Sequence, residues 1–379
     1  GNWRDIFQNL EALCASFPEL LVGFITVFVD ASTPVGFNPY RITRSGIDWE
    51  VPDPDDPWSG IGYWGDHQIV YLLRLLEASE RFHPGRLAGS LSERLFSYAN
   101  VPYRIAPYEE LVRNPKSTIH YDEAAAAVSL ERVERLGGDG RLLLDEAGEV
   151  LLVTLAEKLV VPVLAKLSNF VPGGGIWLNT ERPEWNDANN ALVGYGLSMV
   201  TLYQLRRYLD HLRQLVRSAG GGRVPMSTEV TQWLTAITAA LAGSAPQSPI
   251  SDRDRKALMD ALGGAFSDYR SRVYASGFSG STDVPVSDLV KLCDIAIEHL
   301  DATIRVNRRP DGLYHSYNLV RFESDGTSAA VEHLFEMLEG QVAILDSGVL
   351  SAEERADVID ALFSSAMYRA DQDLSLIHI

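Results

Sequence analysis

The residues best suited to chemistry lie in "RPEWNDANNALVGYG", residues 182–196. Within the six residues 185–190, five side chains supply one indole, one carboxylate and three amides: Trp185, Asp187, Asn186, Asn189 and Asn190. A single Asp or Asn would cap a helix that begins near residue 188, with the indole packed beneath it. Amides and a carboxylate that pair with hydroxyls, beside an indole that stacks on a sugar face, are also what a carbohydrate site needs. One helix cap needs only one of these polar side chains, so five such groups together exceed that need. The residues alone nevertheless leave both the helix cap and the carbohydrate site open.

Two further stretches place polar and aromatic groups at the start of expected helices. The stretch 62–77, "GYWGDHQIVYLLRLLE", contributes Trp64, Asp66 and His67. The stretch 3–9, "WRDIFQN", contributes Arg4, Asp5 and Gln8. An Arg–Asp pair can hold sugar hydroxyls through charge-assisted hydrogen bonds, whereas the alternative for both stretches is an ordinary polar helix start.

One histidine and several carboxylates complete the set of candidates. His315 lies between tyrosines in "DGLYHSYN" (311–318), where it could bind phosphate or hydroxyls or simply pack in a loop. The stretch 46–58, "GIDWEVPDPDDPW", adds two tryptophans and five carboxylates, Glu50 among them. Two further carboxylates, Glu336 and Glu339, could point inward, but most such glutamates belong to solvated helix faces.

Helical periodicity dominates the chain. Apolar residues recur at i, i+3, i+4 and i+7 over 69–76, 289–304 and 331–345. Further helices are expected near 5–15, 19–31, 121–136, 148–169, 188–216, 227–242, 252–275 and 351–366. Ser251 before the helix near 252 and the capping box Ser351–Glu354 mark two helix starts.

The many helices and few strand-like stretches predict an all-α fold. Some connections are short, whereas residues 32–66 form a long loop rich in Gly, Pro and aromatics. A loop of that length in a compact domain is usually functional. Short turns at one end and elaborate loops at the other predict a toroid of helical hairpins whose loops build a cleft.

Composition and motifs narrow the function. The chain has 379 residues and a net charge of -18, which argues against nucleic acid or an anionic membrane as partner. Its longest apolar run, residues 20–29, is too short to span a bilayer. We find no GxGxxG, Walker, HExxH or GxSxG motif and no Cys/His cluster, so we expect no metal and no redox or nucleotide cofactor. Cys14 and Cys293, expected to be buried thiols, suit a reducing compartment such as the cytoplasm.

The stretch "EWNDANNALVGYGLS" (184–198) resembles the Trp-Asn-Asp segment of inverting glycoside phosphorylases of the cellobiose phosphorylase type, also found in cyclic glucan synthases. Similar likenesses link 3–9 to that family's Arg-Asp-x-x-Gln-Asp segment and 64–67 to its Trp-x-Asp-Asp-His segment. The chain departs from the family at Pro183, Glu184, Asn9 and Gly65. The family belongs to the six-hairpin (α/α) glycosidase superfamily, so the resemblance implies an (α/α)6 toroid, here incomplete at both ends.

The resemblance also implies roles for single residues. Asp187 would be the general acid that protonates the glycosidic oxygen while inorganic phosphate, as co-substrate, attacks the anomeric carbon from the opposite face. Substrate contacts would come from Arg4, Asp5, Gln8, Trp64, His67, Trp185, Asn186, Asn190 and His315. An inverting hydrolase would need a second carboxylate to activate water, for which Glu50 and Asp66 are the candidates. A non-catalytic glycan-binding protein, with Asp187 as a helix cap, is the alternative of another class.

We therefore expect residues 1–373 to form one catalytic barrel fragment that cleaves a glycosidic bond in a glucan or oligosaccharide. Residues 374–379, "LSLIHI", match the direct translation of a transposon end used in DNA library preparation. We expect them to be sequencing-adapter read-through, with the gene continuing beyond them.

Overall fold

A computed structural model describes residues 3–38, 41–44, 46–55, 68–180, 191–246 and 249–375, without the side chains of residues 3–5 and 41. Its helices are α1 (Trp3–Ser16), η1 (Pro18–Leu20), α2 (Leu21–Ala31), η2 (Gln68–Leu72), α3 (Leu73–Phe82), α4 (Arg86–Ser90), α5 (Tyr108–Arg113), α6 (Glu123–Leu136), η3 (Gly137–Arg141), α7 (Leu155–Leu167), α9 (Met199–Ser218), α10 (Thr228–Ala242), α11 (Asp252–Ser276), α12 (Val286–Val306), α13 (Leu338–Asp346) and α14 (Ala352–Ser364). Most helical stretches expected from periodicity are thus present, within a few residues at their ends.

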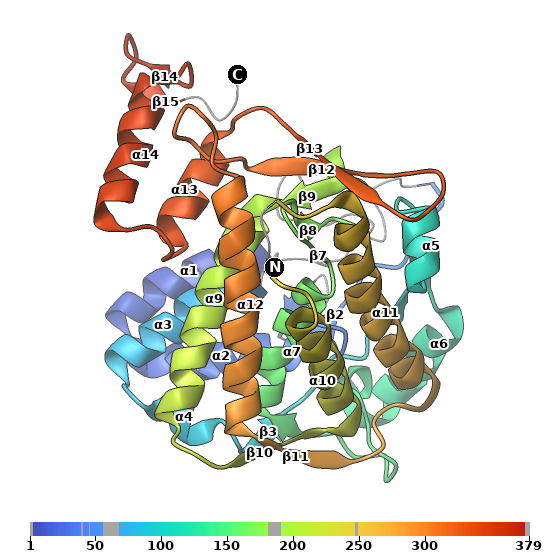
Figure 1. The fold of residues 1–379 in the computed structure, drawn as a ribbon. Helices are drawn as coiled ribbons and strands as arrows, with labels where there is room; N and C mark the ends of the chain where they lie inside the picture. The colour runs from blue at the N-terminus through green and yellow to red at the C-terminus, as the bar shows by residue number, and fades with distance from the viewer. Residues whose placement is uncertain are drawn as a thin grey trace.

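Helix α7 forms the centre of the molecule. All of its residues are buried: most are apolar, and its charged residues Glu157, Lys158 and Lys166 are buried with them. It begins where the Thr154 hydroxyl accepts a hydrogen bond from the backbone of Glu157, an N-cap interaction. Helices α2, α9 and α10 contact it, and Figure 1 shows α9, α10, α11 and α12 standing roughly upright beside one another.

A five-stranded antiparallel sheet lies at the C-terminal end of α7. Its order is β13 (Ala329–His333), β12 (Tyr317–Phe322), β9 (Gly196–Ser198), β8 (Gly175–Trp177) and β7 (Phe170–Val171). Figure 1 shows this sheet above the upright helices. Because β7 follows α7 almost directly, the helix leads straight into the sheet.

Short two-stranded sheets occupy the N-terminal end of α7 and the flanks. At that end β10 (Arg223–Ser227) pairs with β11 (Ser281–Pro285), and β3 (Arg94–Phe96) pairs with β6 (Val153–Thr154). The remaining pairs are β1 (Arg41–Thr43) with β2 (Gly46–Asp48), β4 (Tyr103–Ile105) with β5 (Ile119–Tyr121), and β14 (Tyr368–Arg369) with β15 (Leu374–Ser375). Part of the expected read-through segment therefore closes a small hairpin.

The predicted all-α (α/α)6 toroid is wrong. The structure is 55% helical but 17% strand, and its five-stranded sheet is a substantial second component. Two expected helices fail at this sheet: 188–216 contains β9, and 331–345 begins in β13. The local periodicity of both stretches fitted a helix. In the structure both β9 and β13 instead form backbone hydrogen bonds with β12, which for β9 is far away in the sequence.

Other local predictions are confirmed. The Ser251 side chain caps α11, and Ser351 and Glu354 form the capping box of α14. Cys14 and Cys293 are buried and free. Among the helices described, none has the length and apolar character needed to cross a bilayer.

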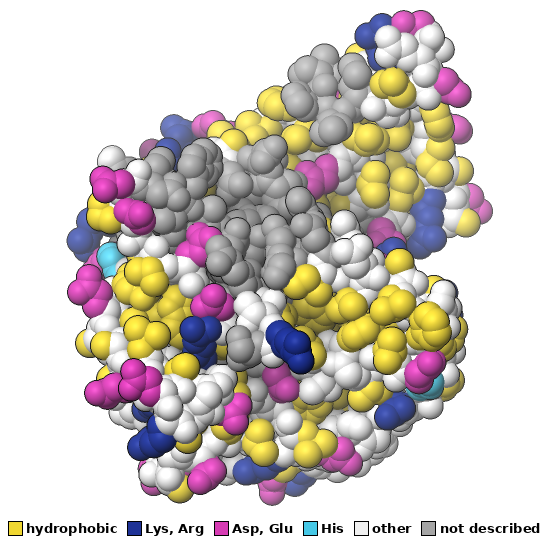
Figure 2. All heavy atoms as spheres, turned by 180° about the vertical axis from the view of Figure 1, so that it is seen from behind, with side chains coloured by type: hydrophobic (Ala, Val, Ile, Leu, Met, Phe, Trp, Pro, Cys, Tyr) yellow, Lys and Arg dark blue, Asp and Glu magenta, His cyan; other side chains and the backbone are white. Residues whose placement is uncertain are grey.

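Helices α13 and α14 form an arm that projects from the body (Figure 1). In α14 only Val358 is buried. Large apolar side chains are exposed on this arm, including Val342, Ile359 and Phe363. Figure 2, which views the molecule from behind, shows hydrophobic side chains on the surface of this arm. The arm is therefore less tightly packed than the body.

Candidate functional site

The Trp-Asn-Asp segment lies between two described segments, 177–180 and 191–196, that are bonded to each other. We call this bonded base the root of loop 178–195. Backbone hydrogen bonds join Leu178 N to Gly196 O (2.9 Å) and Gly194 N to Leu178 O (2.7 Å). The buried Trp177 indole Nε1 donates to Gly194 O at 2.9 Å. Three bonds thus hold the two strands of the loop together just outside residues 181–190, so the loop leaves the sheet at a fixed place.

The same root is joined to the end of α7. Asn169 follows that helix, and its side-chain oxygen accepts a bond from Asn179 Nδ2 at 2.8 Å. Asn169 Nδ2 donates to Ala165 O, and Asn179 is 1% exposed. A buried amide pair therefore positions Asn179, two residues before the undescribed part of the loop.

The turn that precedes β8 is held by two side-chain amides, one from Asn307 directly after α12 and one from Asn318 in β12. Asn318 Nδ2 donates to Gly174 O at 2.7 Å, and Asn307 Nδ2 donates to Gly173 O at 3.0 Å. Gly175 has φ +132°, and an added Cβ would lie 2.9 Å from the backbone of Ser198. No other residue fits there without moving β9, which explains the glycine.

The long loop 32–66 and the adjoining His67, together called loop 32–67, run from Ser32, whose backbone oxygen accepts a bond from Lys158 in the first turn of α7, to a buried amide pair before α3. Gln68, the first described residue after 56–67, donates from Nε2 to Phe28 O (2.9 Å) and to Asn38 Oδ1 (3.0 Å). Gln68 and Asn38 are each 1% exposed. The turn before Asn38 is closed by Thr33, whose backbone and hydroxyl both bond to the Phe37 backbone.

Loop 32–67 also contacts the last turns of α7. The Gly36 backbone packs so closely on Val161 and Ala165 that a Cβ would lie 2.7 Å from the Ala165 methyl. Lys166 Nζ lies 5.7 Å from the centre of the Phe37 ring. The turn at Gly36 and Phe37, within loop 32–67, therefore packs on the last turns of the buried helix that leads into loop 178–195.

Glu50 lies on the flank of this region. Its backbone oxygen accepts a bond from Tyr103 Oη at 2.5 Å, and its side chain is half-buried. The neighbouring Trp49 is buried beneath Arg141, whose guanidinium lies 5.3 Å from the indole centre. The backbone at Glu50 is thus well anchored.

His315 lies in a rigid loop before β12. Its backbone oxygen accepts a bond from Tyr203 Oη at 2.9 Å, and its ring stacks on His333 with centroids 4.1 Å apart. One ring nitrogen bonds the Leu334 backbone, whereas Nδ1 is buried and has no partner among the described residues. Burial, with the charges of His333 and Arg309, lowers the pKa of His315 to about 4, so its imidazole is neutral at pH 7.

Replacement of His315 by Gln is expected to reduce acid sensitivity. The folded protein resists protonating His315 until about pH 4, whereas an unfolded histidine titrates near 6.5. Since the unfolded state binds the proton more readily in that window, stability falls as pH decreases from 6.5 to 4, by at most about 3 kcal/mol. Urea unfolding at both pH values should show a smaller decrease in the variant.

A matched control for this measurement is His120→Gln, at an exposed histidine on β5. That variant should keep the pH dependence of the parent chain. If His315→Gln also kept it, His315 would not be the group responsible.

The structure reaches only some of the predicted site residues. Seven lie outside the described residues: Trp64, Asp66, His67, Trp185, Asn186, Asp187 and Asn190. Arg4 and Asp5 are on α1, but their side chains also lie outside the description, whereas Gln8 is exposed on that helix. Glu336 forms an ion pair with Arg309, and Glu339 accepts a bond from Tyr317. The mutual geometry of the proposed catalytic groups therefore remains a prediction.

Sequence reasoning overlooked the residues that hold the loops. Trp177, Asn169 and Asn179 fix one root, and Asn38 and Gln68 fix the other. Trp177 and Asn179 lie in "GGGIWLNT", directly before the stretch that drew attention. A tryptophan and an asparagine beside a triple glycine were a usable signal, because buried polar side chains require partners.

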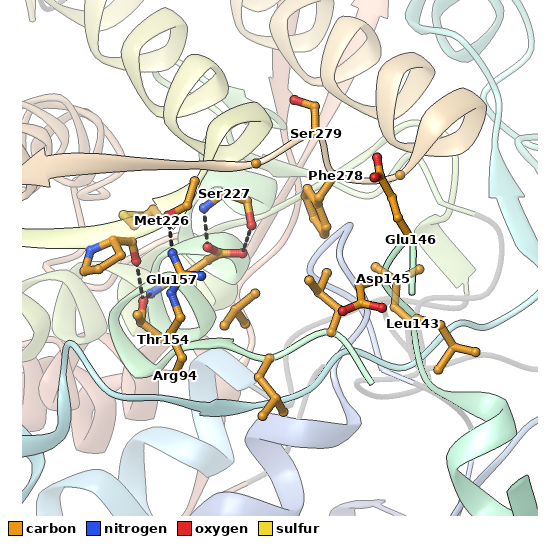
Figure 3. Close-up of a pocket in the computed structure, with 18 of the residues that line it drawn as sticks. Arg94, Leu143, Asp145, Glu146, Thr154, Glu157, Met226, Ser227, Phe278 and Ser279 are labelled. Atoms are coloured by element: carbon orange, nitrogen blue, oxygen red, sulfur yellow. Dashed lines mark hydrogen bonds between the residues drawn. The ribbon is translucent and has the colours of Figure 1, made fainter. Parts of the chain in front are cut away.

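A large cavity lies at the other end of α7. It measures about 590 Å³ and is bordered by Thr154, Glu157 and Ser227 on one side and by Asp145 and Phe278 on the other (Figure 3). None of the described site residues predicted from sequence lines it. Its size therefore does not identify it with the Trp-Asn-Asp region.

Within the described ranges, no group of three or more His, Cys, Asp or Glu side chains could hold a metal ion. No protein-family model matches the chain, and no curated protein matches its sequence significantly.

Proposed function

We propose that the chain belongs to a carbohydrate-active enzyme that cleaves a glycosidic bond with inversion, by phosphorolysis, with Asp187 as general acid. The observation that supports this most directly is the packing of the Gly36–Phe37 turn, within loop 32–67, on the last turns of α7, the helix that leads into loop 178–195. One loop carries Trp185 and Asp187 and the other carries Trp64 and Asp66. Loops that adjoin the same helix end can build one site.

The chemistry of the two loops fits a sugar substrate. Indoles supply flat apolar faces, and the amides of Asn186 and Asn190 can donate and accept bonds to hydroxyl pairs. A carboxylic acid beside the glycosidic oxygen protonates the leaving group, and phosphate, already a nucleophile, needs no base. His315 and the Arg4–Asp5 pair are assigned to substrate contacts on the same proposal. The substrate would be a glucan or an oligosaccharide.

Hydrolysis is the second candidate function. The fixed backbone position of Glu50 supports it, because an inverting hydrolase needs a second, well-positioned carboxylate. An inverting hydrolase places its two carboxylates roughly 6.5–9.5 Å apart so that water fits between base and sugar. Glu50 or Asp66 would be that base. Tyr103 holds the Glu50 backbone, which would give such a base a fixed position.

The test is incubation of the chain with a panel of gluco-oligosaccharides, with and without inorganic phosphate. We expect sugar 1-phosphate to form only when phosphate is present, with inverted anomeric configuration by NMR. Free inverted sugar formed without phosphate would instead establish the hydrolase. Sugar binding without turnover under either condition would contradict both and leave a glycan-binding protein.

A further inference from the structure

A small pocket between α6, α11 and the turn 33–35 has an unusual charge for this protein. It measures about 200 Å³, and its charged lining residues are Arg104 and Arg132. No carboxylate lines it, although the chain carries a net charge of -18. The pocket is therefore a local positive site on an acidic molecule.

The two arginines keep donors available for a ligand. Arg104 Nε bonds Asp122 Oδ2 at 3.2 Å, while Asp122 Oδ1 caps α6 by accepting from Ala125 N. This bond uses only one of the Arg104 nitrogens. Throughout the described ranges, the half-buried Arg132 side chain forms no hydrogen bond or ion pair. Asn100 adds an amide to the same lining.

The rest of the lining is apolar and aromatic. Val35 and Tyr103 are 5% and 6% exposed, so this part is a preformed surface of the core. Tyr274 forms another wall, and the Arg104 guanidinium lies 4.8 Å from the centre of its ring. Stacking on the ring holds the planar guanidinium in a defined orientation.

We propose that this pocket binds a small organic anion, with a phosphate or carboxylate head on Arg104 and Arg132 and an apolar or aromatic body against Val35, Tyr103 and Tyr274. A guanidinium fork matches both heads, because each presents two oxygens to parallel N–H donors. Neutral polyols lack the charge, and cations are repelled by the two arginines. The pocket borders the start of loop 32–67 through Thr33 and Val35. Its two arginines take no part in the amide pairs Asn38–Gln68 and Asn169–Asn179, and anion binding is measured without any turnover, so this proposal is tested separately from the enzyme activity.

The test is calorimetric titration of the whole chain with four probes: phenyl phosphate, benzoate, inorganic phosphate and phenol. Phenyl phosphate and benzoate should bind, the stronger of the two identifying the preferred head. Phenol should not bind, and inorganic phosphate should bind more weakly than phenyl phosphate. Binding of phenol as tight as that of phenyl phosphate would overturn the proposal.

Arg132 provides the decisive variants. Arg132→Gln is expected to weaken phenyl phosphate binding about tenfold or more, and Arg132→Lys by less, because charge remains while the fork is lost. Arg135→Gln, an exposed change on the same helix, is the matched control and should bind as the parent does. Thermal melting of each variant without ligand checks the fold. Unchanged affinity in Arg132→Gln, with the parent's melting temperature, would place the ligand elsewhere and refute the proposal.

Discussion

Asp187→Asn is expected to lower the rate of glycosidic-bond cleavage by about 10²–10⁴-fold while leaving sugar binding nearly unchanged. The amide has the shape of the carboxylic acid and can still hydrogen-bond a hydroxyl. It cannot release a proton to the glycosidic oxygen, so the poor leaving group departs unaided. Rates and binding constants measured on the same oligosaccharide separate these two effects.

Leaving-group chemistry makes this prediction specific. A glycosyl fluoride does not need a strong acid to leave, so Asp187→Asn should slow its cleavage far less than that of an oligosaccharide. Glu184→Gln, the same carboxylate-to-amide change three residues earlier, is the matched control and should retain most of the activity. Equal losses in both variants, or equal losses on both substrates, would contradict the role of Asp187 as general acid. A folded Asp187→Asn variant with full activity would reduce Asp187 to a helix cap.

Helices were predictable here because their determinants are local. The apolar stripe of 289–304 lies within α12, and the Ser351–Glu354 box begins α14 as expected. The apolar run 159–165 likewise lies inside α7, although the burial of its charged residues Glu157 and Lys158 depends on distant partners. Periodicity and caps depend on residues within a few positions of one another, so a single sequence contains them.

Most strands were missed because their determinants are distant; only the alternating stretch 313–322, which contains β12, had a strand-like pattern. Strand β9 has three residues, too few for an alternating pattern, and it forms through pairing with β8 and β12, the latter more than a hundred residues away. In 331–345, the spacing of Val331 and Leu338 fits a helix, yet Val331 pairs with Val320 of β12. Sequence patterns do not contain such partners, which is why the all-α prediction failed.

The candidate site divides in the same way. Its chemical groups could be selected from sequence, because an indole beside amides and a carboxylate is conspicuous in any chain. The residues that position them could not, since the partner of Asn179 is Asn169 and that of Gln68 is Asn38. The role of these amides in positioning the loops becomes visible only in the folded structure, where each one meets its partner.

Glu157 provides the second large expected effect, on stability. Its carboxylate, 1% exposed, accepts three bonds: from Ser227 N (2.6 Å), Ser227 Oγ (2.9 Å) and Tyr98 Oη (2.9 Å). These bonds join the first turn of α7 to β10 and to the segment after β3, at the cavity shown in Figure 3. Burial raises the pKa of Glu157 even though all three donors favour its charged form.

Glu157→Ala is therefore expected to cost about 3–5 kcal/mol of unfolding free energy, because it strands a buried N–H and two buried hydroxyls and removes a negative charge near Lys158. Glu157→Gln should cost only about 1 kcal/mol. Its Oε1 can face the Ser227 N–H, which can only donate, while the two hydroxyls rotate to accept from Nε2. Urea unfolding of both variants, with the exposed Glu146→Ala as control, measures this order. If Gln were as destabilising as Ala, the negative charge beside Lys158, rather than the hydrogen bonds to Ser227 and Tyr98, would be what Glu157 contributes.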